Sequence, residues 1–536
     1  MILKTAVDGR HSDGKFLIER NMADKGQIEG THPMGELGKT EGAGDLDRCT
    51  IESYAGKVHI RWDDAAAVTA MGQMPVFVDF LKTSGLWDGF IKECPLRYKS
   101  PNAPTHVDIL GTLLMSVLAG QCRYAHISGL RGDGVNPELL GMRKVMSEDS
   151  ARRAFQHATP EETREWLQKH LRQTYEPLLE HAWVMDLDST VKPLYGKQEK
   201  AVKGYNPVKP GRPSHVIHTY LIAELRLVLG AEVQAGNETA SSYAQPSFWT
   251  YFDSLPPDSR PVFIRGDAGW GNERMMEEAE QRDQAYLFKI RQSVKIKELL
   301  ASSFAMDQWQ TAGQGWEGIW SEVRLAGWTS KRKVIILRRP LPEDAVAAMK
   351  KKRRSARSQQ RELEMGWEKE GHVIYEHAVL VTNMVADILT LAQHYRDRGD
   401  AENNFDELKN QWGWLGFTTH DHARSEMMTL FVALVYNWWS LFVRLSTPNR
   451  RAEAITSRPL LLHAIGRKTS HGNQSTLTLT SLHAQASLIQ TAMKAVTRFL
   501  FSIRTVAEQL TPGERWRRIL LVAFRAFPLT PAVNMP

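Results

Sequence analysis

Between residues 183 and 290 the chain alternates short β-like runs with turns rich in Gly, Pro and Asp, and this pattern constrains the fold most. The runs span residues 183–188, 215–221, 225–229 continuing into 232–234, 261–265 and 285–290, with a helical spacing of apolar residues at 272–284. Several strands followed by a strand-helix-strand unit indicate one mixed core. The sequence therefore predicts an α/β fold.

Acidic side chains stand where two of these runs stop. Asp188 ends the first run before Ser189, and Asp267 follows Gly266 at the end of a later run. Carboxyl ends of neighbouring strands open into the same crevice of an α/β sheet, so both carboxylates are candidates to share a metal ion. Asp186 lies on the same strand face as Asp188 and is the alternative first ligand. The competing interpretation is that each Asp is an ordinary turn or capping residue.

A later stretch, Y-R-D-R-G-D-A-E-N-N-F-D-E-L-K, runs from Tyr395 to Lys409. On one continuous helix Tyr395, Arg398, Glu402 and Lys409 would fall within an arc of roughly 60°. A carboxylate flanked by a phenol, a guanidinium and an ammonium suits a metal ion that acts on phosphate. The alternative is a solvated face with weak ion pairs.

These candidate ligands contain carboxylates and no His or Cys. Asp188, Asp267 and Glu402 would form a hard, oxygen-rich set that favours Mg²⁺, with Mn²⁺ as the second choice, over Zn²⁺. The three cysteines of the chain have no metal-type spacing, and their odd number favours a reducing compartment.

The stretch Tyr395–Lys409 resembles the third motif of the DDE insertion-sequence transposases, which reads Y, two residues, R, three residues, E, six residues, K. Asp188-Ser-Thr190 and Arg265-Gly-Asp-Ala-Gly269 resemble the first and second motifs. The amino-acid sequences of residues 186–190, 204–213 and 456–459 are most similar to those of the insertion-sequence thirteen-eighty group. The resemblance covers about residues 57 to 500.

The resemblance implies an RNase H-like catalytic core that contains a β-rich insertion. It also implies that Asp188, Asp267 and Glu402 bind the metal and that Tyr395, Arg398 and Lys409 hold DNA phosphates. Its expected reaction is nicking of transposon ends and joining of the 3′-hydroxyl to target DNA. The expected partners are double-stranded DNA with terminal inverted repeats and a second copy of the chain on the paired ends. In related transposases, a tryptophan of the insertion can stack on a flipped base.

Changes in composition and in the spacing of apolar residues along the sequence predict six regions. They are a flexible leader (1–56), a helical DNA-binding region (57–175), the first part of the core (176–290), a β-rich insertion with a basic loop (291–385), the second part of the core with the Glu402 helix (386–450) and a helical C-terminal region (451–536).

Three segments suggest contacts with DNA. Residues 139–146 and 147–155 are compatible with a helix-turn-helix that bears Arg152 and Arg153, or with a plain helical bundle. The loop 197–213 and the run 350–361 are rich in Lys and Arg.

Packing inside the β module is the expected role of Trp309, Trp316, Trp320, Trp328 and Trp367.

The net charge of +7 permits a nucleic-acid partner without requiring one. The apolar run 427–443 is short for a membrane span and is expected to be a buried helix, so no membrane partner is predicted. The expected location is the cytoplasm, on the nucleoid of a bacterial-type cell. A metal nuclease of the same fold and an inactive DNA-binding regulator are the alternative functions.

Overall fold

The computed structural model describes residues 48–100, 102–206, 209–238, 245–341, 369–370, 373–448, 451–481 and 484–525. Residues 1–64 and 65–536 are separate units. In the first unit, β1 (Arg48–Ser53) and β2 (Gly56–Arg61) form an antiparallel hairpin. Most of the expected flexible leader lies outside the described residues, and its last residues belong to this hairpin.

The second unit is built on one mixed sheet, to which the described residues contribute eleven strands in the order β10-β11-β12-β14-β9-β8-β4-β6-β5, with β7 on β6 and β13 on β14. The strands are β4 (Val184–Pro193), β5 (Val202–Lys203), β6 (Pro213–Ile222), β7 (Leu227–Ala235), β8 (Phe263–Gly266), β9 (Tyr286–Lys289), β10 (Gln310–Gly313), β11 (Trp316–Val323), β12 (Arg332–Pro340), β13 (Lys369–Glu370) and β14 (Val373–Thr382). The predicted α/β class is confirmed.

Strand β4 joins the parallel and antiparallel parts of this sheet. It pairs in parallel with β8, where Leu187 meets Gly266, and antiparallel with β6, where Asp188 meets Thr219. Strand β8 pairs in parallel with β9. The prediction that Asp188 ends its strand is wrong, because pairing with β6 carries β4 on to Pro193.

The strands expected between residues 291 and 385 are present, and they extend the core sheet through the pairing of β14 with β9. Trp309, Trp316, Trp320 and Trp328 are buried or partly buried. The guanidinium of Arg338 lies 3.8 Å from the Trp309 ring centre. Packing is therefore the observed role of these four tryptophans, while Trp367 and the basic run 350–361 lie outside the described residues.

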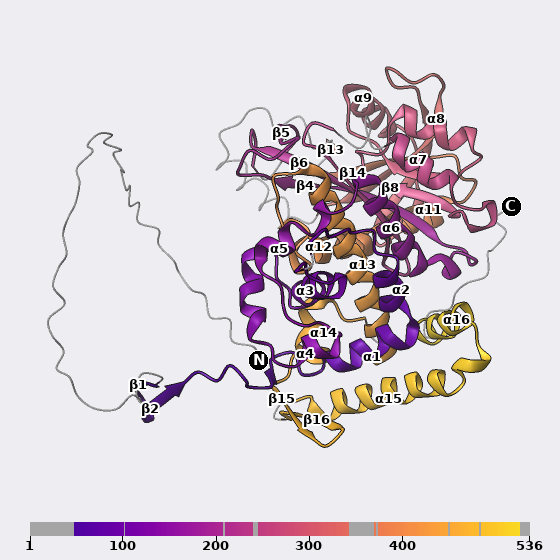
Figure 1. Ribbon diagram of the computed structural model, residues 1–536. Coiled ribbons are helices and arrows are strands. Elements are labelled where there is room, and N and C mark those ends of the chain that lie inside the picture. Colours follow the sequence, from indigo (N-terminus) through magenta and orange to yellow (C-terminus); the bar gives the residue numbers. More distant parts are fainter. Residues whose placement is uncertain are drawn as a thin grey trace, which may run out of the picture. The chain divides into compact units, whose positions relative to one another are not determined.

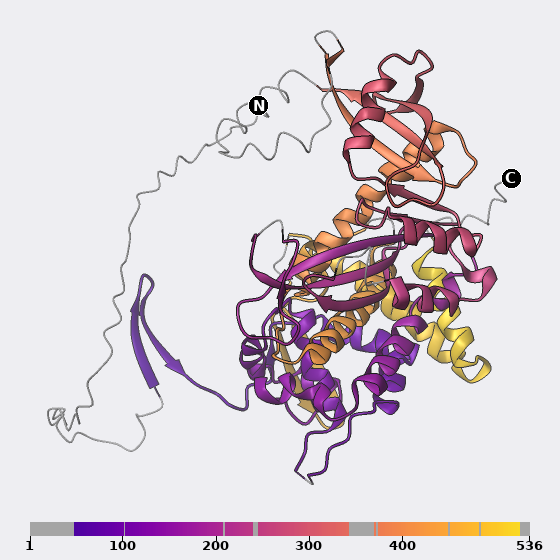
Figure 2. The ribbon, with the colours of Figure 1, turned by 90° about the horizontal axis from the view of Figure 1, so that it is seen from above.

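The helices of the described chain are α1 (Met74–Ser84), α2 (Leu86–Lys92), α3 (His106–Leu118), α4 (Asn136–Leu139), α5 (Glu148–Arg152), α6 (Pro160–Gln173), α7 (Gln245–Asp253), α8 (Glu273–Gln281), α9 (Val294–Ser303), α11 (Ile388–Arg396), α12 (Arg398–Gln411), α13 (His422–Ser446), α14 (Ala454–Leu461), α15 (Ala486–Thr505) and α16 (Pro512–Ala523). The expected buried helix is α13, which lies between the sheet and the helices α1 and α3 (Figures 1 and 2).

Helix α13 is tied to the sheet edge by a buried amide. Asn437 accepts a hydrogen bond from the Val228 backbone N–H and donates one to the Val228 carbonyl, both at 2.9 Å. By length and composition α13 is the one helix of the described chain that could span a membrane. Its apolar window is 94% buried within the protein, as expected for a core helix.

Of the two interpretations of residues 139–155, the structure does not show the helix-turn-helix. Residues 140–147 are not helical, and α5, capped by Ser147 as expected, has only five residues. Arg152 and Arg153 pair with Asp149 on the same short helix. The C-terminal region is not wholly helical, because β15 (Gly466–His471) and β16 (Gln474–Leu479) form a hairpin on β3 (Val68–Thr69).

Candidate active site

Alternate residues of β4 place Asp186, Asp188 and Lys192 on one face of the strand. At the start of this face, Asp186 is fully buried and accepts two hydrogen bonds from Arg265 of β8, at 2.6 and 2.7 Å. Arg265 also donates to the His394 carbonyl of α11. Both oxygens of Asp186 are thus occupied by a buried guanidinium, which holds β4, β8 and α11 together.

Asp188, one step further along the same face, meets helix α12. Its Oδ1 lies 3.4 Å from Arg398 Nη2, and its Oδ2 lies 3.5 Å from Lys409 Nζ. Burial raises the pKa of Asp188, while the charges of Lys409 and Arg398 oppose that rise. Asp188 is therefore a buried carboxylate whose charged form is costly. Its two cationic partners lie farther from it than Arg265 lies from Asp186.

The predicted single helix from Tyr395 to Lys409 is divided in two. Tyr395 belongs to the last turn of α11 and Arg398 begins α12, with Asp397 between them. The Asp400 N–H bonds to the Asp397 carbonyl at 3.1 Å, which tightens the chain to an i−3 turn at this point. The two short helices still bring Arg398, Glu402 and Lys409 onto one face of α12.

Arg398 connects two of the candidate carboxylates. Its Nη1 lies 2.6 Å from Glu402 Oε1, and its Nη2 reaches Asp188. The Arg398 side chain is 6% exposed, whereas that of Glu402 is 65% exposed. The guanidinium is therefore buried between a buried carboxylate of the sheet and a solvent-facing carboxylate of the helix.

Asp267 follows β8 in a tight turn, with its Oδ1 accepting a 2.8 Å hydrogen bond from the Gly269 N–H. Because Leu187 of β4 pairs with Gly266 of β8, Asp188 and Asp267 follow this pair on adjacent segments of the chain, and the charge of Asp267 raises the pKa of Asp188. Burial raises the pKa of Tyr395 to about 12, and the charge of Asp267 adds to the rise. The raised pKa keeps the Tyr395 phenol neutral, so this group is a hydrogen-bond donor.

The structure gathers Asp188, Asp267, Glu402, Tyr395, Arg398 and Lys409 into one region. Among the described residues, no group of three His, Cys, Asp or Glu side chains is arranged to hold a metal ion. The donor chemistry fits a hard divalent cation, because Asp188, Asp267 and Glu402 offer carboxylate oxygens with neither His nor Cys among them. Asp186 is committed to Arg265, which leaves Asp188 as the β4 carboxylate that faces α12.

Two buried charged residues of β8 and β4, Arg265 and Lys192, were not singled out as partners from the sequence. Arg265 precedes the Gly-Asp pair of the second motif. A charged residue inside an apolar strand indicates a buried ion pair. Lys192 is buried, donates to the Gly416 carbonyl at 2.5 Å, and has its pKa lowered to about 8 by burial. A lysine on the interior face of a strand was again a signal of an internal partner.

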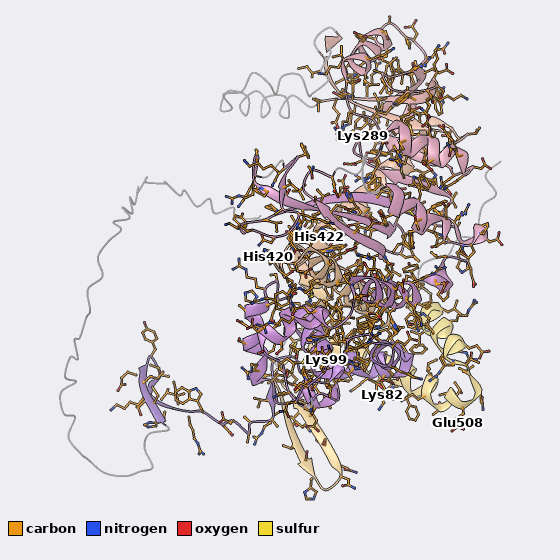
Figure 3. The ribbon with its side chains drawn as sticks, turned by 45° about the horizontal axis from the view of Figure 1, so that its top comes forward. Lys82, Lys99, Lys289, His420, His422 and Glu508 are labelled. Atoms are coloured by element: carbon orange, nitrogen blue, oxygen red, sulfur yellow. The ribbon has the colours of Figure 1, made fainter. Side chains whose placement is uncertain are left out.

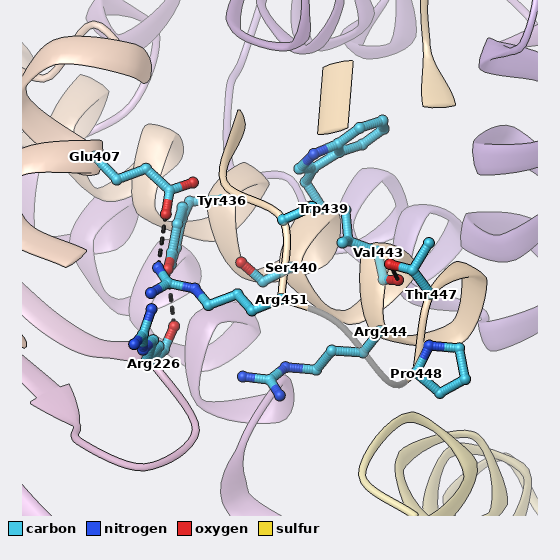
Figure 4. A pocket seen from close by; sticks show the side chains of 11 residues that line it. Arg226, Glu407, Tyr436, Trp439, Ser440, Val443, Arg444, Thr447, Pro448 and Arg451 are labelled. Carbon is cyan, nitrogen blue, oxygen red and sulfur yellow. Dashed lines mark hydrogen bonds and ion pairs between the residues drawn. The ribbon is translucent and has the colours of Figure 1, made fainter. Parts of the chain in front are cut away.

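A polar pocket outside this site lies between α12, α13 and the loop before β7 (Figure 4). Arg451 is 2.8 Å from Glu407, Arg226 pairs with Asp400 at 2.8 Å, and Arg444 lies over the Phe524 ring. Burial raises the pKa of Glu407 to about 7. These charges are partnered within the protein, so the pocket is a polar junction between α12, α13 and the loop before β7.

Residues 91–500 match the family model described as Transposase DDE domain group 1. This match covers more than half of the chain, and the chain therefore belongs to that family of DDE transposases. No curated protein matches the chain in sequence.

Among solved structures, a cryo-EM structure of the piggyBac transposase synaptic complex with hairpin DNA is 10% identical to this chain. The alignment covers 87% of each chain, with a TM-score of 0.33. A likeness at this TM-score does not establish a common fold.

Proposed function

We propose that this DDE transposase nicks transposon ends by metal-dependent hydrolysis of a phosphodiester and joins the freed 3′-hydroxyl to DNA, as a member of the insertion-sequence thirteen-eighty group. The observation that carries the proposal is the contrast along β4, where Asp186 is paired and Asp188 faces Arg398 and Lys409 beside Asp267. Such a site presents carboxylates for a metal and cations for a phosphate in one place.

The strand order supports an RNase H-like core for this site. Strands β7, β6 and β4 are antiparallel neighbours, and β8 and β9 follow on the other side of β4 in parallel. In this arrangement Asp188 lies on the central strand and Asp267 follows the strand beside it.

Asp188, Asp267 and Glu402 would hold Mg²⁺, or Mn²⁺ in its place. Such a metal lowers the pKa of a bound water or 3′-hydroxyl and stabilises the leaving oxygen of a phosphodiester. Arg398 and Lys409 lie beside Asp188, and both cations would bind phosphate oxygens of DNA. Tyr395 would donate a hydrogen bond to a neighbouring phosphate, because its raised pKa keeps the phenol protonated.

The other DNA contacts remain proposals. The loop 197–213 and the run 350–361 would contact the phosphate backbone and make binding depend on salt. The helical region 57–175 would contact the terminal inverted repeats, and a homodimer would pair two ends before joining them to target DNA.

The test uses a labelled duplex that carries the DNA flanking the gene for this chain, incubated with Mg²⁺ and the full-length protein. Asp267→Asn and Glu402→Gln remove two of the proposed ligands. Asp406→Asn is the matched control, because Asp406 is an exposed carboxylate of α12 that bonds to Asn410 of the same helix. We expect cleavage at the repeat boundary by the parent and the control, and loss of cleavage in both site variants and in EDTA.

The products separate the candidate functions. Joined strands support a transposase, whereas cleavage without joining indicates a metal nuclease. Binding that survives EDTA with no products indicates a DNA-binding regulator. Cleavage by Asp267→Asn at the parental rate would contradict the proposed site.

A further inference from the structure

The hairpin β15–β16 projects from the helical part of the second unit (Figure 3). Its base is anchored, since Gly466 pairs with Thr69 of β3 and the Lys468 N–H bonds to the Ala67 carbonyl at 2.8 Å. Within the described residues, β15 beyond Lys468 pairs with β16 alone. The outer part of the hairpin is therefore a free two-stranded ribbon on a fixed base.

The register gives the hairpin two unlike faces. Cross-strand pairs share a face, so Arg467 with Thr478, Thr469 with Thr476 and His471 with Gln474 form one face. We call these six residues the polar face, and all six are exposed. The opposite face carries Leu477 and Lys468 near the base and the pair Ser470 and Ser475 near the tip.

The charges of the two faces differ as well. Lys468, on the opposite face, lies 2.5 Å from Glu138 Oε2. In the described part of the chain no ion pair involves Arg467, on the polar face. The hairpin sequence from Gly466 to Leu479 contains no Asp or Glu. The polar face is thus an exposed surface of hydrogen-bonding groups with a free positive charge and no acidic side chain.

We propose that the polar face of β15–β16 docks in the major groove of duplex DNA and contacts base edges. This partner rests on the transposase function proposed above, and the ribbon itself is outside the metal site. Charge complementarity favours DNA over a second copy of the chain, since the polar face of another copy offers Arg467 no acidic side chain, whereas the DNA backbone is anionic.

The dimensions and chemistry fit that groove. A strand of six residues spans about 20 Å, and the major groove, about 12 Å wide, admits a two-stranded ribbon. Arg contacts guanine, Gln contacts adenine, and a Thr methyl packs on the thymine methyl. The polar face offers each of these side chains in exposed positions.

The experiment compares binding of a labelled duplex from the DNA flanking the gene with a shuffled duplex of equal length, in EDTA so that no cleavage occurs. The variant Arg467→Ala with Gln474→Ala changes the polar face. The variant Ser470→Ala with Ser475→Ala is the matched control on the opposite face. All four residues are exposed, so we expect parental thermal unfolding for both variants.

We expect the polar-face variant to lose roughly tenfold or more of its affinity for the flanking duplex, with little change on the shuffled duplex. The serine variant should bind both duplexes like the parent. Equal weakening on both duplexes would overturn base reading, since only phosphate contacts act on every sequence alike.

Other outcomes separate this proposal from the proposed function. Unchanged binding by the polar-face variant, beside a parent that binds and cleaves, overturns the hairpin proposal alone. A change in oligomeric state with unchanged DNA affinity also overturns it and identifies a self-contact. Absence of DNA binding by the parent overturns the hairpin proposal together with the transposase mechanism.

Discussion

Two neighbouring positions on one face of β4 use the same residue type for different purposes. At the start of β4, Asp186 meets Arg265 in a fully buried, two-bond pair. At its middle, Asp188 meets Arg398 and Lys409 at 3.4 and 3.5 Å, with 15% of its side chain exposed. Two residues of separation thus divide a structural carboxylate from one that is available to a ligand.

The two aspartates differ in how tightly their arginine partners bind them. Both Asp186 oxygens are saturated by one guanidinium whose remaining nitrogen bonds to a backbone carbonyl. Arg398 instead divides its nitrogens between Asp188 and the exposed Glu402. Longer and shared contacts are weaker, so ligands can compete for Asp188 at a lower cost than for Asp186.

The largest expected effect is on catalysis. Asp188→Asn removes a charged ligand, and we expect cleavage of the flanking duplex to fall about a thousandfold or more, as loss of several kcal/mol of metal-based stabilisation implies. Its thermal unfolding should match or exceed that of the parent, because the variant no longer buries this carboxylate. Cleavage at the parental rate would remove Asp188 from the site.

The next effect is on stability. Asp186→Asn leaves Arg265 buried without its anion, and we expect the free energy of unfolding to fall by about 3–5 kcal/mol. Chemical denaturation measures the change, with Asp406→Asn as the control. A normal free energy of unfolding with loss of cleavage would reverse the roles given to Asp186 and Asp188.

The opposite face of β4 predicts a dependence of stability on pH. His218 of β6 bonds to Ser189 of β4 at 2.9 Å, and burial lowers the pKa of His218 to about 4. The unfolded state then binds more protons between the unfolded pKa and about 4, so stability falls as the pH falls through this window.

His218→Gln should remove up to about 3 kcal/mol of that dependence. Denaturation curves of the parent and the variant across the window measure it. Equal pH dependence in the two proteins would contradict a buried neutral imidazole behind β4.

The smallest expected effect concerns Lys409. Lys409→Met should weaken DNA binding about tenfold at low salt and reduce the salt slope by about one, since one phosphate contact is lost. It should also raise the pKa of Asp188 further, because the Lys409 charge holds that pKa down. Unchanged salt dependence would place Lys409 outside the DNA contact.

The strand pattern of residues 183–290 was sufficient to predict the α/β class, because alternation and turn residues are local signals. The pairing of Asp186 with Arg265 was not predictable, since it depends on the parallel register of β4 and β8. The break between α11 and α12 at Asp397 was not predictable either, because the spacing of Tyr395 and Arg398 fits one continuous helix as well as two.

The hairpin β15–β16 shows a different limit. Gly472-Asn473 forms its two-residue loop, with φ of 58° at Gly472, and Thr469, Thr476 and Thr478 of the flanking strands have high strand propensity. The local signal was present in the sequence. It was not sufficient to predict the hairpin, because an almost wholly polar strand pair has no apolar alternation to mark it.

The most direct measurement is Mn²⁺ binding followed by electron paramagnetic resonance, with the parent, Asp188→Asn and the control Asp406→Asn in the absence of DNA. We predict that the parent and the control bind Mn²⁺ with the same affinity and that Asp188→Asn loses it while remaining folded. Equal Mn²⁺ affinity in all three proteins would contradict a metal site that includes Asp188.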